Sequence, residues 1–362
     1  MSKVHNFSAG PSILNQDVLK KASEAVANFN NLNLSILEIS HRSKDFVAVM
    51  DNAVSLVKEL LEVPEGYSVL FLQGGASTGF LKTILNFMKE NGNGAYLNTG
   101  AWSKKALKEA EKLGSMTVVA SSEGKNFNYI PKGFTVPDNT DYLHITTNNT
   151  IFGTQIKDIP TQENTLLIAD MSSDIFSRKI NISDYAMIYA GSQKNMGPAG
   201  TTLYIVKDEL LGKTGRNIPT MLDLTTHIAK GSMFNTPPVY PIYVSMLTLE
   251  WLKANGGIEW IEKVNEEKAA LLYNEIDTNP LFEGTAAKED RSNMNVTFVL
   301  TDESKKEAFD AMWKEAGISG INGHRDVGGY RASIYNAMPI ESIQVLVDTM
   351  KQLANKYNLV NN

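Results

Sequence analysis

The chain has 362 residues, a length that suggests two domains rather than one core. Hydrophobic residues make up 43% and charged residues 20%, as in an ordinary globular enzyme, and the net charge of −6 argues against a nucleic-acid binder, which needs a basic face. There is no cysteine, which excludes disulfides, thiolate metal sites and a cysteine nucleophile.

In chain order, apolar periodicity first predicts two amphipathic helices, over 16–29 and 44–61, with Asn15 and Ser43 as their N-caps. Short apolar runs then alternate with helices that include 102–113 and one ending near residue 90. This pattern predicts an α/β fold with a mostly parallel sheet that is buried on both faces. The expected strands are 67–72, 95–97, 116–120, 142–145, 165–169, 186–190 and 202–206.

From about residue 239 the pattern changes to α+β, and Asn255-Gly256-Gly257 is the expected boundary. We therefore predict a large domain over 16–257 and a smaller α+β domain over 258–362, with the segment 1–15 packing near the smaller one. The smaller domain should follow a helix at 239–254 and contain helices at 258–277, 304–316 and 341–357 and strands at 296–300 and 332–335.

The N-terminus lacks the apolar core of a signal peptide, and no apolar run approaches the roughly 18 residues of a membrane span. We expect a cytoplasmic protein without membrane contact. No pattern in the sequence indicates a metal site.

A lysine stands among small residues directly after an expected strand. Lys194 lies in the run GSQKNMGPAG at 191–200, where small neighbours would let a planar cofactor approach. An unperturbed lysine has a pKa near 10.4, so an enzyme that uses this amine must favour its neutral form by desolvation or nearby cations. The alternative is a solvated loop lysine.

Asp170 ends the apolar strand that precedes the one leading to Lys194. Ligands bind at the carboxyl ends of parallel strands, so the two side chains can share one site. An aspartate beside a pyridine nitrogen keeps that nitrogen protonated, which suits pyridoxal phosphate (PLP). Viewed alone, Asp170 could equally be a helix N-cap or a turn residue.

Two further strand ends carry candidate cofactor contacts. The Gly-rich stretch 74–78 lies between a strand and a helix, where backbone N–H groups can bind phosphate, although it matches neither GxGxxG nor a P-loop. Trp102 could stack on a cofactor ring or simply pack in the core.

Arginine is scarce: only six of the 34 basic residues are Arg, which leaves 28 Lys. The rigid guanidinium fork suits carboxylates and phosphates, so each arginine is a candidate anion ligand. Two arginines follow a histidine, at His41-Arg42 and His324-Arg325, and could jointly hold a dianion. Arg331 follows a double glycine and could clamp a carboxylate. Surface ion pairs are the alternative for each.

Together these segments resemble the phosphoserine aminotransferases, a family of class-V, fold-type I PLP enzymes. The matching motifs occur in family order over nearly the whole chain: NFSAGP at 6–11, HRSK at 41–44, Gly74-Gly75, GSQKNMGPAG at 191–200, GSMFNTPP at 231–238 and GHRDVGGYRASIYNAMP at 323–339.

The resemblance implies a homodimer with active sites at the interface and a role for each motif. Lys194 would hold PLP as a Schiff base, Asp170 would pair with its ring nitrogen, and Trp102 would stack on the ring. Further cofactor contacts would come from Thr150, from Ala76, Ser77 and Gln193 at the phosphate, and from Asn235 and Thr236 of the other subunit. Arg331 would bind the substrate α-carboxylate, and the second anion would meet His41, Arg42, His324 and Arg325, with the 41–42 pair donated across the dimer.

The resemblance also implies the reaction, in which glutamate and 3-phosphohydroxypyruvate give O-phosphoserine and 2-oxoglutarate. Some relatives also act on phosphohydroxythreonine in vitamin B6 synthesis, and the sequence leaves that substrate open. Two positions depart from some members: Ser77 replaces an arginine that assists anion binding, and Ala9 replaces a serine.

Two other functions remain alternatives at this point. An aminotransferase for small substrates, of the serine–glyoxylate or alanine–glyoxylate type, would not need the two His-Arg pairs. A non-catalytic PLP- or nucleotide-binding module would not need Lys194 and Asp170 together.

Overall fold

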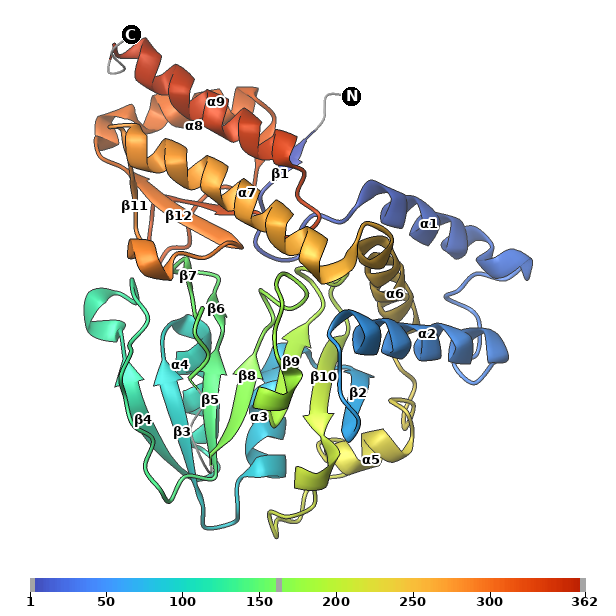
Figure 1. Cartoon of the computed structure of the whole chain (residues 1–362). Helices are drawn as coiled ribbons and strands as arrows, with labels where there is room; N and C mark the ends of the chain where they lie inside the picture. Colours follow the sequence, from blue (N-terminus) through green and yellow to red (C-terminus); the bar gives the residue numbers. More distant parts are fainter. Residues whose placement is uncertain (1–3, 161–164, 359–362) are drawn as a thin grey trace.

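A seven-stranded sheet forms the centre of the larger part of the computed structural model, which describes residues 4–160 and 165–358 (Figure 1). The strand order is β2-β10-β9-β8-β5-β3-β4. The strands are β2 (Tyr67–Leu72), β3 (Asn93–Asn98), β4 (Ser115–Ser121), β5 (Tyr142–Thr146), β8 (Leu166–Asp170), β9 (Met187–Gly191) and β10 (Thr202–Lys207).

The five strands β4, β3, β5, β8 and β9 run parallel, which confirms the predicted sheet, but β10 runs antiparallel to both β9 and β2. The connection from β9 to β10 spans only residues 192–201, which is too short for the crossover that a parallel pair requires. The lysine-bearing loop is therefore a direct return between neighbouring strands.

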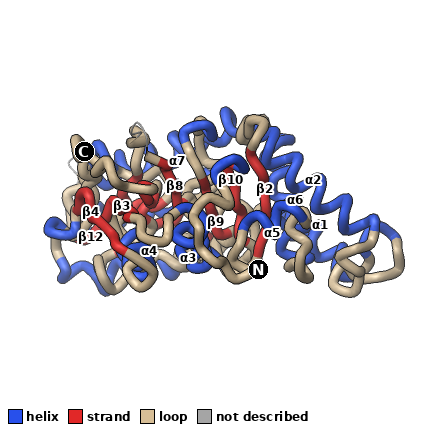
Figure 2. The backbone as a smooth tube through the Cα atoms, turned by 90° about the horizontal axis from the view of Figure 1, so that it is seen from below, coloured by secondary structure: helices blue, strands red, loops and turns tan. Residues whose placement is uncertain are grey.

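Helices cover both faces of the sheet, and alternate strand residues face opposite cores. On one face, Ile188 packs in a cluster with the helices α1 (Gln16–Ala27), α2 (Lys44–Leu60) and α6 (Val239–Ala254). On the other, Tyr189 packs in a cluster with α3 (Gly75–Phe87) and α4 (Ala101–Ala110). Figure 2 shows the strands along the middle of the molecule, with α1, α2 and α6 beyond β2 at one end.

The predicted helix starts are confirmed at the level of single hydrogen bonds. The Asn15 side chain accepts from the backbone N–H of Asp17 at 2.8 Å, and the Ser43 hydroxyl accepts from that of Phe46 at 3.3 Å. The first helix ends at Ala27, two residues earlier than predicted, because Asn28 is extended (φ −158°) and a 3-10 turn over Phe29–Asn31 follows.

The C-terminal part is built on an antiparallel sheet of order β11-β12-β14, from Phe282–Gly284, Asn295–Leu300 and Tyr330–Ser333. The helices α7 (Gly257–Thr278), α8 (Lys306–Glu315) and α9 (Ile340–Lys356) pack on it around a second core. Helix α7 joins both cores, since Ile261 belongs to the first and Leu272 to the second.

The last strand starts and ends two residues earlier than the predicted 332–335. Tyr330 already pairs with Phe298 of β12, and the carbonyls of Ile334 and Tyr335 accept hydrogen bonds from the Lys268 ammonium instead of from a strand. The Ile334 N–H still donates to the Met294 carbonyl at 2.9 Å, so the side chain from α7 replaces strand donors only at the two carbonyls.

Several short elements have no counterpart in the sequence pattern. They are the helix α5 (Leu224–Ala229), the hairpin of β6 (Asn148–Asn149) and β7 (Thr154–Gln155), the parallel pair of β1 (His5–Asn6) and β13 (Ile318–Ser319), and 3-10 turns at Glu123–Lys125, Ile182–Asp184, Asp208–Leu210, Lys288–Asp290 and Glu303–Lys305. Within the described ranges, no helix combines the length and apolar character needed to cross a membrane.

Candidate active site

A cavity of about 390 Å³ lies where β3, β5, β8 and β9 end, between the large sheet and the loop that leads into β14. This is the edge of a parallel sheet at which ligands bind. Nine of the predicted site residues line it: Ala76, Trp102, Thr150, Asp170, Gln193, Lys194, His324, Arg325 and Arg331.

Lys194 is buried against the floor of the cavity. Its ammonium nitrogen donates to the Thr150 hydroxyl at 2.9 Å, and its backbone carbonyl accepts from the Ser12 hydroxyl at 2.6 Å. Burial lowers the pKa of Lys194, Asp170 opposes this shift and the Arg331 charge adds to it, and the resulting pKa is about 8. At pH 7 roughly a tenth of an amine with this pKa is neutral, far more than for an unperturbed lysine, and imine chemistry uses that neutral form.

Asp170 is the last residue of β8 and is only 4% exposed. Its Oδ1 accepts the backbone N–H of Ser172 at 2.9 Å, and the Ser172 hydroxyl accepts from Gly191 N–H at 3.1 Å, which ties the ends of β8 and β9 together. Burial raises the pKa of Asp170, opposed by the Ser172 hydrogen bonds and by Lys194. A carboxyl group in this setting gains from a protonated partner in the cavity.

Trp102 lies in the first turn of α4, and its ring centroid is 6.0 Å from the Lys194 nitrogen. Its indole nitrogen is buried and has no hydrogen-bond partner in the part of the chain that the structure describes. The flat ring faces a cavity that also contains the amine, which is the arrangement needed for stacking on a planar ligand.

The predicted Gly-rich loop is shorter than expected, because α3 already begins at Gly75. Gly74 is the N-cap at φ 107° and Gly75 has φ 65°, conformations that favour glycine. Among the described residues no side chain caps this helix, and Ala76 in its first turn lines the cavity. Its free N–H groups can bind a phosphate.

Arg331 projects from β14 into the same cavity. Its Nε is buried without a partner in the described ranges, and burial lowers the pKa of the guanidinium, opposed by Tyr335. A partly buried guanidinium with a buried, unpaired Nε gains when an anion joins it, so Arg331 can serve as a carboxylate clamp. His324 and Arg325 lie at the mouth, where the Arg325 side chain is 91% exposed.

Five predicted site residues do not line this cavity. Ser77 is beside Ala76 in α3, and His41 and Arg42 lie in the turn before α2. Asn235 donates to the Gln73 side chain at 2.8 Å, and Gln73 donates to the Thr236 carbonyl at 3.0 Å, outside the cavity. Four of the five, all except Ser77, are the residues that the resemblance assigns to the partner's site.

The other three arginines stabilise the fold instead of lining the cavity. Arg178 pairs with Asp174, and Arg216 donates to the Met88 carbonyl. Arg291 donates two hydrogen bonds to Asp277. The arginines left for anion binding are the three that the motifs indicated.

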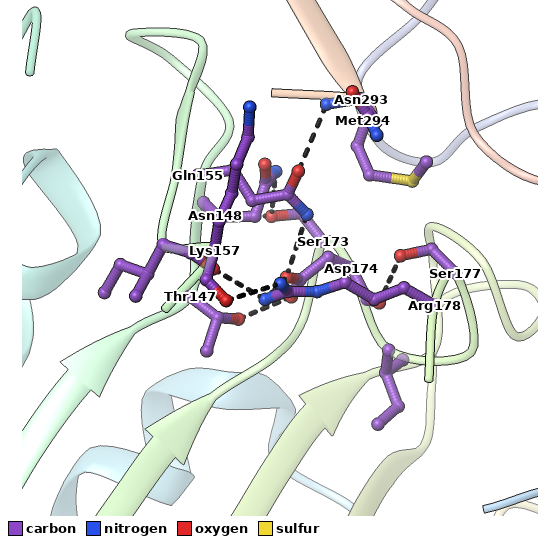
Figure 3. A network of polar contacts seen from close by, with 12 residues as sticks. Thr147, Asn148, Gln155, Lys157, Ser173, Asp174, Ser177, Arg178, Asn293 and Met294 are labelled. Carbon is purple, nitrogen blue, oxygen red and sulfur yellow. Dashed lines mark hydrogen bonds and ion pairs between the residues drawn. The ribbon is translucent and has the colours of Figure 1, made fainter. Parts of the chain in front are cut away.

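Sequence reasoning missed a buried polar network beside the cavity (Figure 3). The Asp174 carboxylate accepts from the Thr147 hydroxyl at 2.5 Å and from the Gln155 amide at 3.2 Å, and it pairs with Arg178 at 3.4 Å. This network joins the segment after Asp170 to the β6–β7 hairpin that carries Thr150. The spacing of Asp174 and Arg178 at i and i+4 was the one local signal for it.

The cavity also contains residues that no motif singled out. Lys105 lies one turn after Trp102, with its ammonium 4.3 Å from the indole centroid. Ala9 and Gly10 reach the cavity from the N-terminal segment, and Asp326 lies beside the two residues at its mouth. The helical i, i+3 spacing from Trp102 could have indicated Lys105.

These groups fit PLP. A buried amine of lowered pKa suits the aldehyde, a buried carboxyl suits the ring nitrogen, the flat Trp102 ring suits the planar face, and the N–H groups at the start of α3 suit the phosphate. The Arg331 guanidinium, whose Nε has no partner among the described residues, remains for the carboxylate of an amino-acid substrate.

Comparison with known proteins agrees with this chemistry. The phosphoserine aminotransferase of Flavobacterium johnsoniae is 62% identical over 98% of this chain and 99% of its own length, and that of Bacteroides fragilis is 55% identical over 97% and 98%. The solved phosphoserine aminotransferase from Bacillus circulans subsp. alkalophilus has a TM-score of 0.95 at 41% identity, covering 98% of this chain and 99% of that one.

A second solved phosphoserine aminotransferase, studied for radiation damage to its Schiff base, also has a TM-score of 0.95, at 46% identity over 98% of this chain and all of that one. These matches confirm the resemblance and the fold class predicted from the sequence. Because the family pattern described as aminotransferase class-V spans residues 4–346, nearly the whole chain, this protein belongs to the class-V aminotransferases.

Proposed function

We propose that this protein is a PLP-dependent transaminase that converts 3-phosphohydroxypyruvate and glutamate into O-phosphoserine and 2-oxoglutarate, the amino-transfer step of serine biosynthesis. The observation that carries the proposal is the 62% identity, over 98% of the chain, to a relative named for this activity. The cavity supports it independently, since Lys194, Asp170 and Arg331 converge there.

PLP, when bound, supplies the electrophilic carbon that accepts the amino group and the ring that stabilises negative charge at the substrate α-carbon. The residues of the chain would bind the cofactor and move the protons. Lys194 would hold the cofactor covalently and, once released, its amine with a pKa of about 8 can take and return the α-proton. Asp170 would keep a proton on the ring nitrogen.

Substrate binding divides between two kinds of anion site. Arg331, whose Nε lacks a partner in the part of the chain that the structure describes, would orient the α-carboxylate so that the α-proton faces Lys194. His324 and Arg325 at the mouth would meet the distal anion, which is a carboxylate in glutamate and a phosphate in the other substrate. Trp102 would cover the ring and exclude water.

We further propose a homodimer with shared active sites. Leu32, Leu34 and Leu37, between α1 and α2, are exposed, and exposed apolar groups of this kind mark interaction surfaces. His41 and Arg42 follow them directly, and His41 has a buried nitrogen without a partner in the described ranges. A two-fold partner would let this segment complete the neighbouring cavity. The cytoplasm is the compartment that we expect.

The activity is tested by the visible spectrum of the purified holoenzyme, with O-phosphoserine, glutamate and alanine added separately. We expect O-phosphoserine and glutamate to convert the yellow cofactor band to the pyridoxamine form, while alanine leaves it unchanged. Conversion by alanine but not by O-phosphoserine would instead indicate an aminotransferase for small substrates.

The shared site is tested by mixing two inactive variants, Lys194→Ala and Arg42→Ala, under conditions that exchange subunits. Each mixed dimer would contain one complete site, because Lys194 of one subunit would work with Arg42 of the other. With random pairing, about half of the dimers are mixed and each has one complete site of two. Activity should therefore recover to roughly a quarter of the wild-type value. An inactive mixture, with exchange verified by mass spectrometry, would refute the shared site.

A further inference from the structure

The mouth of the cavity contains a negative charge that an anion site does not need. Arg325 and Arg331 line the cavity together with Lys105 and His324, a set of groups suited to substrates with several negative charges. Asp326 lines the same cavity and stands next in sequence to the two residues that would meet the distal anion.

The carboxylate of Asp326 is directed at both of these residues. One oxygen is 3.4 Å from His324 Nδ1, and the other is 3.7 Å from Arg325 Nε. The backbone N–H of Asp326 is also 3.3 Å from the same Nδ1. An unprotonated Nδ1 accepts this N–H, whereas a protonated Nδ1 pairs with the carboxylate.

A tight turn fixes this arrangement. The backbone N–H groups of Val327 and Gly328 both donate to the His324 carbonyl, at 2.9 and 2.8 Å. The turn therefore keeps the Asp326 side chain beside the imidazole and the guanidinium, and it does not depend on the carboxylate. An uncharged side chain at position 326 can keep the same backbone.

We propose that Asp326 is a specificity-determining residue, an internal counter-ion that weakens binding of the phosphate side chain more than binding of the glutamate carboxylate. This inference rests on the proposed function. A phosphate dianion carries about twice the charge of a carboxylate, and Coulomb repulsion from Asp326 scales with that charge. The counter-ion thus brings the affinities of the two substrates closer together, so that one pocket can bind and release both.

The effect should be modest because the groups at the mouth are partly exposed. Exposed ion pairs contribute about 0.2–1 kcal/mol, which corresponds to roughly 1.4- to fivefold in a dissociation constant. We therefore expect Asp326→Asn to lower the dissociation constant for O-phosphoserine about three- to fivefold and that for glutamate less than about twofold.

The experiment is a spectral titration of the holoenzyme with each amino acid, comparing wild type with D326N and D326E. Asp348→Asn is the matched control, since it removes an equal charge from the exposed face of α9, where Asp348 contacts only Gln344 in the described ranges. In D326E and D348N, the ratio of the dissociation constant for O-phosphoserine to that for glutamate should equal the wild-type ratio. The gain in D326N should shrink at high salt, because screening weakens exposed charges.

Equal or weaker binding of O-phosphoserine by D326N would overturn the proposal, because a carboxylate that merely orients His324 and Arg325 would lower affinity when it is removed. An equal gain in affinity for O-phosphoserine in D348N would also overturn the proposal, since removing any negative charge from the protein would then have the same effect. If O-phosphoserine does not change the spectrum of the wild-type holoenzyme, the proposed function itself is refuted. That outcome is distinct from failure of the proposal for Asp326.

Discussion

At the scale of single residues, the chemistry depends on where a charge is buried. Lys194 and Asp170 were identified from strand ends and small neighbours in the sequence, and the structure shows them in one cavity. The sequence also indicated that Lys194 would need a lowered pKa. The physical cause, burial assisted by Arg331 from a segment more than a hundred residues away, is visible only in three dimensions.

The pKa of Lys194 predicts how covalent capture of PLP depends on pH. The neutral amine is the reactive form and it dominates above the pKa of about 8. The initial rate at which apo-protein gains the yellow band should rise roughly tenfold per pH unit below that value and level off above it. Stopped-flow absorbance on mixing with PLP measures it.

The Lys194→Ala variant is the control for this profile, and it should gain no covalent band and have no turnover. A wild-type profile that keeps rising to about pH 10 would instead indicate an ordinary solvated lysine.

At the scale of elements, the predictable parts are those with a strong local pattern. The long helices, their Asn15 and Ser43 caps and the parallel strands were predicted to within a few residues, because apolar periodicity and capping are local properties. The β1–β13 pair could not be predicted, since two-residue strands separated by some three hundred residues carry no periodicity. The Asp174 network was missed because Thr147 and Gln155 come from another segment, and the local spacing of Asp174 and Arg178 does not reveal them.

Helix α7 positions the chain after β14, the strand that carries Arg331, through Lys268, which is fully buried. Its ammonium donates to the carbonyls of Ile334 and Tyr335, at 3.0 and 2.8 Å, and the Tyr335 hydroxyl donates to the Ala9 carbonyl at the cavity. These bonds fix the chain three residues after Arg331. Lys268 therefore connects the packing of a helix to the position of a guanidinium.

Replacing Lys268 with methionine should destabilise the protein by about 1–3 kcal/mol, because two buried carbonyls lose their donor. The affinity for glutamate should fall as well, because Arg331 loses its support. Thermal unfolding and spectral titration measure the two effects. Lys263→Met, on the exposed face of the same helix, is the matched control, and equal stability of the two variants would contradict the role assigned to Lys268.

At the scale of the whole molecule, the N-terminal segment completes the C-terminal core. The β1 strand pairs with β13, and Phe7 is fully buried in the cluster formed by α7, α8, α9 and the small sheet. Two residues later, Ala9 and Gly10 line the cavity. The beginning of the chain is thus part of both the smaller core and the site.

Truncating Phe7 to alanine should cost about 3–5 kcal/mol, the usual effect of removing a buried aromatic side chain. It should also weaken PLP retention, because Ala9 and Gly10 lose their anchor. Denaturant unfolding and cofactor release on dilution measure both effects. Val4→Ala, at an exposed position, should change neither, and a Phe7→Ala variant of normal stability would show that the segment is dispensable.

The cavity draws its lining from Ala9 near the start of the chain to Arg331 near its end. During synthesis on the ribosome, the large sheet through β10 can emerge and begin to fold while Arg331 has yet to be translated. The nascent chain then contains Lys194 and Asp170 but lacks β14, the strand that places Arg331 in the cavity lining. We therefore expect complete capture of the cofactor to be a late event in biogenesis, because a chain that ends before Arg331 lacks part of the cavity lining.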